Sequence, residues 1–152
     1  MPSPGRRSAA TGAGTATYLF QANRNIYNSS SAGISATTGA INLTLQSDYD
    51  GNDDGVIRLV GGTMNTNGGN VSIGGGTGTI AAASGYAAGN STYVTGVTIA
   101  NTITAAGGNV IINGRGAVLT TSGNLGVLLG TAGSITTTGS GSISVNGTGR
   151  GS

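Results

Sequence analysis

The sequence predicts an all-β fold, a parallel β-helix in which short strands are wound into stacked coils. Groups of three to five apolar or β-branched residues recur along the chain, bounded by Gly, Asn or Thr, which is typical of short strands between turns. Helix signals are weak, because 31 glycines interrupt the chain and both Glu and Lys are absent. Both prolines, Pro2 and Pro4, lie at the start, so the rest of the backbone can donate hydrogen bonds to a sheet.

The individual strands show the alternation expected of a sheet with one buried face. In INLTL (41–45) the three aliphatic residues share one face, while Asn42 and Thr44 take the other. In VIRLV (56–60), Arg58 is expected to point outward between two inward aliphatic neighbours. Each strand therefore offers one row of aliphatic side chains to a common interior.

A repeat indicates how these strands are arranged. Four segments each contain an apolar residue, a stretch of Thr, Ala or Asn, a glycine turn and an alternating strand, and repeats of this kind predict a solenoid. Asn70 and Asn109 occupy the same place in two repeats, which predicts a ladder of asparagines along one corner. The four segments are GISATTGAINLTL (33–45), TMNTNGGNVSIGGG (63–76), TITAAGGNVIINGRG (102–116) and SITTTGSGSISVNGTG (134–149).

Three sides of seven or eight residues predict a coil of roughly 20 to 25 residues. The chain is then expected to hold about five or six coils, with excursions at 46–55 and 82–96. The spacing between repeats exceeds one coil of this length. We expect a single domain at 17–149, a poorly ordered N-terminal tail at 1–16 and a short tail at 150–152. A β-sandwich is the alternative architecture.

The segment ANRNIYNSSSAGISATTGAINLTLQSDYDGNDDGVIRLVGG (22–62), followed by MNTNGGNVSIGGG, resembles the repeat body of filamentous-haemagglutinin-type exoproteins. These are the large bacterial adhesins of two-partner secretion, and the resemblance spans residues 17 to 149. It implies a right-handed β-helix, secretion through an outer-membrane partner and a role in surface attachment. It supplies no catalytic residue. Because the chain has no Asn-Pro, it resembles a fragment of the fibre body and not the exported N-terminal module.

The composition argues against catalysis and against nucleic-acid binding. With no His or Cys, the chain lacks the common nucleophile–base pairs and the usual transition-metal ligands. Six arginines against four aspartates leave a net charge of +2, which is too small and too scattered for a nucleic-acid interface. No apolar run is long enough to predict a transmembrane helix. We therefore expect a protein that is not an enzyme and that has no catalytic or cofactor-binding residue.

The loop DYDGNDDG (48–55) contains every acidic residue of the chain. Glycoside hydrolysis needs two carboxylates, but no other catalytic group accompanies these. The loop predicts either a solvated turn, with two Asp-Gly dipeptides, or a weak Ca²⁺ site. The spacing does not match an EF-hand, because no Glu stands at the twelfth position. The candidate calcium ligands are Asp48, Asp50, Asn52, Asp53 and Asp54.

Taken together, these features predict a structural stalk or fibre segment of a secreted adhesin at the bacterial surface. Loops 46–55 and 82–96 would be displayed for attachment to a glycan or protein of a host or neighbouring cell, and the second loop carries Tyr86 and Tyr93. The alternative is an extracellular filament or matrix subunit whose open ends stack on one another. An ice-binding β-helix with a Thr array, or a calcium-dependent carbohydrate-binding one, is more distant.

Overall fold

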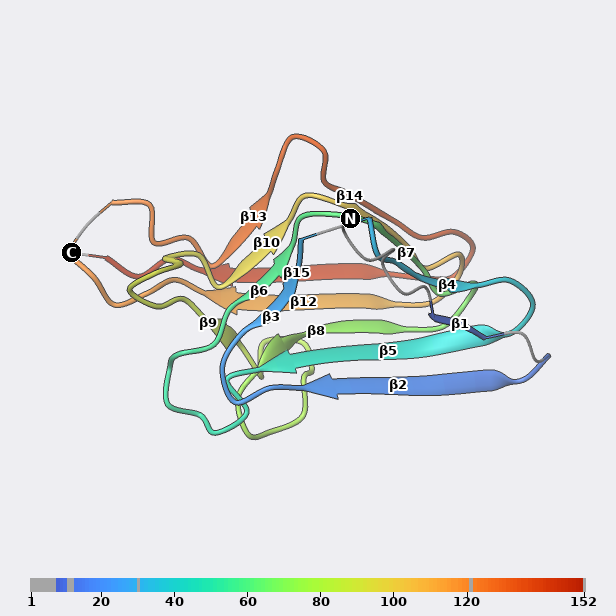
Figure 1. The fold of residues 1–152 in the computed structure, drawn as a ribbon, viewed down its shortest axis with the longest axis horizontal. Coiled ribbons are helices and arrows are strands. Elements are labelled where there is room, and N and C mark those ends of the chain that lie inside the picture. The colour runs from blue at the N-terminus through green and yellow to red at the C-terminus, as the bar shows by residue number, and fades with distance from the viewer. Residues whose placement is uncertain (1–7, 11–12, 30, 121, 152) are drawn as a thin grey trace, which may run out of the picture.

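The computed structural model describes residues 8–10, 13–29, 31–120 and 122–151. The regular secondary structure of these residues is entirely β: fifteen strands, with no helix, and the strands of each sheet run parallel (Figure 1). None of the described segments is a helix long and apolar enough to cross a membrane. The predicted all-β class is therefore confirmed.

The strands form three sheets. The first sheet contains β1 (Ser8–Ala10), β4 (Ile34–Ala36), β7 (Thr63–Asn65), β11 (Thr102–Thr104) and β14 (Ser134–Thr136). The second contains β2 (Thr15–Gln21), β5 (Ala40–Ser47), β8 (Val71–Gly75), β12 (Val110–Arg115) and β15 (Ile143–Thr148), with β9 (Ala87–Ala88) paired to the end of β12. The third contains β3 (Ile26–Asn28), β6 (Ile57–Leu59), β10 (Val97–Ile99) and β13 (Val127–Leu129).

The chain visits the three sheets in a fixed cyclic order, and each passage through all three is called a circuit below. Every strand of the path pairs in parallel with its counterpart of the next circuit. In the first sheet, Ile34 pairs with Met64, Met64 with Ile103 and Ile103 with Ile135, so successive circuits are 30, 39 and 32 residues apart. The predicted coil of 20 to 25 residues is wrong, because each repeat spacing is one whole circuit. The parallel pairing also rules out the β-sandwich alternative, whose sheets are antiparallel.

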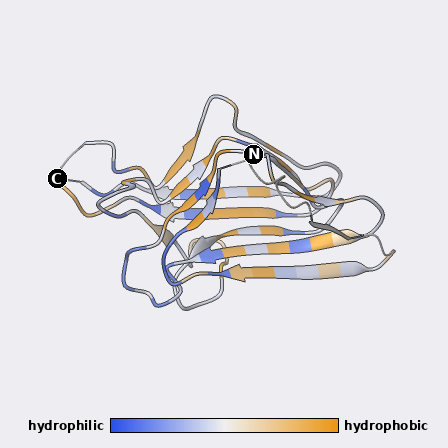
Figure 2. Cartoon of the chain, in the orientation of Figure 1, coloured by the Kyte–Doolittle hydropathy of each residue, from blue (hydrophilic) through white to orange (hydrophobic). Residues whose placement is uncertain are grey.

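The core lies between the sheets and is built from rows of aliphatic residues in register. Leu43, Val71 and Val110 form one such row in the second sheet, and each is at most 1% exposed. Orange and pale or blue residues alternate along β5 in Figure 2, as the sequence predicts for INLTL. Burying a side chain of this size contributes about 1.5 to 3 kcal/mol, so the stacked rows are the main source of stability.

The predicted asparagine ladder is confirmed at the corner that enters the second sheet. Asn42 Oδ1 accepts a hydrogen bond from the backbone N–H of Asn70 (2.9 Å), and Asn70 Oδ1 accepts one from that of Asn109 (2.9 Å). Asn109 Oδ1 in turn accepts from the N–H of Ser142 (3.0 Å). Each side chain therefore satisfies a backbone donor of the next circuit that would otherwise lack a partner at the bend.

Long connections leave the stack only between the second and third sheets, among the described residues. The segment between β5 and β6 starts at Asp48, so the first two residues of the predicted excursion 46–55 belong to β5. The segment between β8 and β10 covers the predicted excursion 82–96 and contains β9. A third connection, 116–126, follows β12 and was not predicted. These insertions explain why the circuits are longer than predicted.

The predicted N-terminal tail, 1–16, contains β1 and the first two residues of β2. Its residues 1–7, 11 and 12 lie outside the described part of the chain. In the predicted tail 150–152, Arg150 forms an ion pair with Asp53, and Ser152 lies outside the described residues. The structure therefore describes contacts on both sides of 17–149, and the predicted domain bounds stay a prediction.

Candidate functional site

The aspartate loop, residues 48–55, leaves β5 at the end of its most buried stretch. Asp48 follows Ser47 directly, both residues are 0% exposed, and Asp48 begins the turn with a φ of 51°. Its carbonyl oxygen accepts a hydrogen bond from the N–H of Gly51 (2.8 Å), which closes a tight turn. Asp and Asn tolerate this left-handed backbone better than other residues with a side chain. The turn prediction is therefore correct for the backbone, but Asp48 is not solvated.

Buried Asp48 has two partners of unequal strength. Its Oδ1 accepts a hydrogen bond from the backbone N–H of Asp54 (3.3 Å), and its Oδ2 lies 3.5 Å from Nη2 of Arg115. Burial raises the pKa of Asp48 above its usual 3.8, and the Asp54 N–H and the Arg115 guanidinium oppose that rise. The pKa of Arg115 is lowered, first by burial and then by the neighbouring charge of Arg150.

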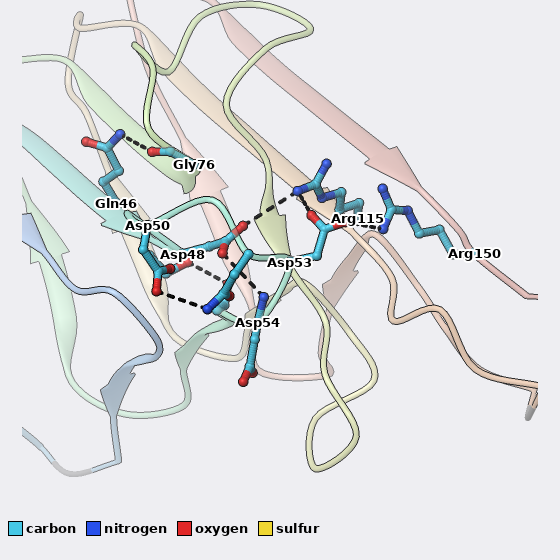
Figure 3. Close-up of polar contacts among 11 residues, drawn as sticks. Gln46, Asp48, Asp50, Asp53, Asp54, Gly76, Arg115 and Arg150 are labelled. Atoms are coloured by element: carbon cyan, nitrogen blue, oxygen red, sulfur yellow. Dashed lines mark hydrogen bonds and ion pairs between the residues drawn. The ribbon is translucent and has the colours of Figure 1, made fainter.

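The other carboxylates of the loop also lie against polar partners. Asp53 contacts Arg115, and its Oδ2 lies 3.1 Å from Nη1 of Arg150 (Figure 3). Asp54 pairs with Arg24 at 3.1 Å, but both side chains are exposed. The remaining aspartate of the loop, Asp50, accepts a hydrogen bond from the side chain of Asn52 (2.9 Å).

The arginines of this network come from different circuits. Arg24 precedes β3 in the first circuit, Arg115 ends β12 in the fourth, and Arg150 follows β15 in the fifth. The aspartate loop belongs to the second circuit, so its carboxylates join circuits along the length of the stack. We call Asp48, Asp53, Arg115 and Arg150 the charged clamp.

The backbone around the charged clamp is fixed by β9. Gly55 and Ala88 exchange two backbone hydrogen bonds, of 3.1 and 2.8 Å, and Ala88 also pairs with Arg115 in the sheet. Strand β9 therefore lies between the aspartate loop and the end of β12. A Cβ at Gly55 would lie 2.2 Å from the backbone nitrogen of Asp48, so this close approach requires glycine.

The five predicted calcium ligands do not converge on one point. Among the described residues no three acidic, His or Cys side chains form a group suited to a metal ion. Arg115 and Arg150 already pair with two of the candidate ligands, Asp48 and Asp53. The geometry thus favours the turn, and the calcium site stays a prediction.

A thermal melt tests calcium binding directly. We expect the unfolding midpoint to be the same in millimolar calcium and in chelator, because two of the loop carboxylates already pair with arginines. Calcium that bound only the folded state would raise the midpoint. The measurement is tyrosine fluorescence against temperature, with Asp50→Asn as a control that removes an exposed carboxylate of the loop. A midpoint that rises in calcium for the wild type and not for the variant would contradict this expectation.

The triplets considered for an ice-binding array are ATT (36–38), TNG (66–68), AAG (105–107) and TTG (137–139), and they lie at the corners between the first and second sheets. Two of their hydroxyls are used inside the fold. Thr66 donates to the carbonyl of Gly69 (2.6 Å), and Thr137 donates to that of Gly108 (2.7 Å). Thr66 and Thr137 therefore stabilise corners, and the ice-binding array stays a prediction.

A second polar cluster lies on the outer face of the third sheet, where Tyr27, Arg58 and Tyr93 meet. The sequence predicts that Arg58 points outward, which is confirmed because its strand neighbours are buried while Arg58 is not. The sequence places Tyr93 in an aromatic excursion. It does not point to Tyr27, which joins the cluster because it pairs in register with Arg58 of the next circuit.

No family model, no curated protein and no solved structure matches this chain. The likeness to filamentous-haemagglutinin-type exoproteins therefore depends on the sequence motifs alone, and it enters the functional proposal on that basis.

Proposed function

We propose that this chain is a right-handed parallel β-helix that serves as a stalk or fibre segment of a secreted adhesin at the bacterial surface. The observation that carries the proposal is the cyclic sheet order, in which each circuit pairs in parallel with the next. A solenoid of this kind grows along one axis, and each repeat contacts only its neighbours. Parallel strands joined by crossovers within one sheet are almost always right-handed, which supports the proposed hand.

The polar interactions of the described residues fit a structural role. Asparagine side chains tie successive corners together, and the charged clamp ties distant circuits together. Three of the four carboxylates, those of Asp48, Asp53 and Asp54, face arginines, and the chain has no His or Cys that could act as a base or nucleophile. We therefore propose a protein that is not an enzyme. Secretion through an outer-membrane partner follows from the sequence resemblance.

The experiment is light scattering during size-exclusion chromatography, combined with negative-stain imaging of the purified chain. We expect a monomer that stays monomeric over a wide range of concentrations, and five circuits about 4.8 Å apart make it only about 24 Å long along the stack. A closed dimer or another finite oligomer would contradict the stalk. A population that grows in length with concentration would favour the second candidate function, described next.

That second candidate is a filament subunit whose ends stack on one another. Its specific support is exposed apolar surface in the first and last described circuits. In the last, Ile143 and Val145 occupy inward-facing register positions yet are 44% and 47% exposed. In the first, Phe20 pairs with buried Leu45 and is 45% exposed. Apolar layers and unpaired strand edges of this kind favour association.

A single substitution separates the two candidates. Val145→Asp places a charge in the last apolar layer, so it should prevent stacking because an unpaired charge is costly to bury. If filaments form, this variant should remain monomeric, whereas Val118→Asp, at a residue 74% exposed outside the strands, should still assemble. Filaments that persist in Val145→Asp would contradict stacking through this layer.

A further inference from the structure

The outer face of the third sheet carries a compact aromatic and cationic cluster. Tyr27 of β3 and Arg58 of β6 are direct register partners, and Thr98 of β10 continues the row. Tyr93 reaches the same place from the connection that precedes β10. We call Tyr27, Arg58 and Tyr93 the tyrosine–arginine cluster.

The geometry of the cluster is that of a platform. The two tyrosine rings are nearly parallel, with an interplanar angle of 21° and ring centroids 6.5 Å apart. The Cζ atom of Arg58 lies 4.6 Å from the Tyr93 centroid and 5.8 Å from that of Tyr27, within the range of cation–π attraction. Because Tyr27 is 53% exposed, much of its ring surface remains open to solvent.

The charge of Arg58 is not neutralised by the described part of the chain. Arg24, Arg115 and Arg150 each pair with an aspartate, whereas Arg58 makes no ion pair with a described residue. Its Nε is buried and has no hydrogen-bond partner among the described residues. A cationic side chain that lies over two stacked aromatic rings, with no counter-ion among the described residues, is suited to an anionic ligand, because a guanidinium can bind a carboxylate through two parallel hydrogen bonds.

We propose that the tyrosine–arginine cluster binds a carboxylate-bearing polysaccharide, with sugar rings stacked on the tyrosines and one uronate carboxylate on Arg58. The C–H faces of a pyranose suit an exposed aromatic ring, and its acid group suits the guanidinium. Ser91 and Thr92, which precede Tyr93, are polar and exposed, which fits a hydroxyl-rich ligand. Beyond buried Thr98 the row continues to Leu128, which is 39% exposed, but a protein partner would need a broader apolar core than this one side chain adds.

This proposal rests on the proposed attachment function and names the ligand class for it. The probe is alginate, a polyuronate, included in native gels at increasing concentration, with neutral dextran in parallel gels. We expect alginate to slow the wild-type chain and dextran to leave it unchanged. Tyr27→Ala and Arg58→Gln should each weaken the apparent affinity by about tenfold, which corresponds to 1.4 kcal/mol. Tyr49→Ala is the matched control, because Tyr49 is 41% exposed but lies on the aspartate loop.

Polyglutamate distinguishes sugar recognition from charge alone. If it slows the chain as strongly as alginate, or if alginate binding survives in Tyr27→Ala and Arg58→Gln, the proposal is overturned. No retardation by alginate overturns it as well. Light scattering on the same samples keeps this result separate from the stalk. A monomer that does not bind alginate refutes the ligand and leaves the stalk intact.

Discussion

Arg115→Ala should lower the free energy of unfolding by about 3 kcal/mol at neutral pH, because it leaves buried Asp48 without its cation. The Asp48 side chain is 0% exposed, and its Oδ2 has no hydrogen-bond partner among the described residues. The same substitution also removes one of the two arginines that form ion pairs with Asp53. This loss of free energy is at the low end of the range for a broken buried ion pair, because the Arg115 side chain is itself 26% exposed. The measurement is urea unfolding followed by circular dichroism.

The loss of unfolding free energy caused by Arg115→Ala should be larger at neutral pH than at acidic pH. Burial already raises the pKa of Asp48 in the wild type, so the carboxyl favours folding when protonated, and that contribution is lost as pH rises through the raised pKa. Removing Arg115 takes away an attraction that opposes the rise, so the pKa of Asp48 should rise further in the variant. The difference between wild type and variant should therefore be largest at about pH 7 and shrink as Asp48 takes up a proton towards about pH 3.

Arg24→Ala is the matched control for this prediction. It also removes an arginine from an aspartate of the same loop, but its side chain is 64% exposed and that of Asp54 is 37% exposed. Exposed pairs contribute roughly 0 to 1 kcal/mol, so this variant should unfold close to the wild type. Equal losses for both variants, or a deficit for Arg115→Ala that does not change with pH, would contradict a buried clamp.

The charged clamp illustrates what sequence could not provide. Arg150 and Asp53 are 97 positions apart, and they meet only because β8 and β12 stack in register between β5 and β15. Arg115 reaches the aspartate loop because β9 holds the end of β12 beside it. Neither contact leaves a local pattern, so the sequence could not show that two arginines of the chain pair with the acidic run.

Local chemistry, in contrast, was predicted well. The alternation in INLTL identified the inward face of β5, and the outward place of Arg58 followed from the same rule. The shared position of Asn70 and Asn109 predicted a side-chain hydrogen bond that the structure contains. The predicted circuit length was wrong because it assumed a coil without insertions. The connections after β5, β8 and β12 lengthen their circuits, while the strands still pair in register.

Gly108→Ala should destabilise the protein by about 3 kcal/mol, because the new methyl group would meet rigid backbone. A Cβ at Gly108 would lie 2.1 Å from the carbonyl oxygen of Gly69 in the circuit below. Gly69 has the same relation to Ile41, with a Cβ 2.0 Å from its carbonyl oxygen, so glycines stack along this corner. To admit the methyl group, neighbouring circuits would have to separate beside the asparagine ladder. Thermal and urea unfolding give the size of the loss.

The comparison with Gly78→Ala isolates this steric cause. Gly78 has open space around its Cβ position and no positive φ, so the same substitution there should cost little or slightly stabilise by restricting the unfolded chain. Gly107→Ala separates conformation from crowding, because Gly107 has a φ of 112° but its nearest Cβ contact is at 4.0 Å. Loss at both Gly107 and Gly108, but not at Gly78, indicates a corner in which both backbone geometry and circuit spacing require glycine. A Gly108→Ala variant as stable as Gly78→Ala would show that the circuits do not approach this closely, which contradicts the stacked corner.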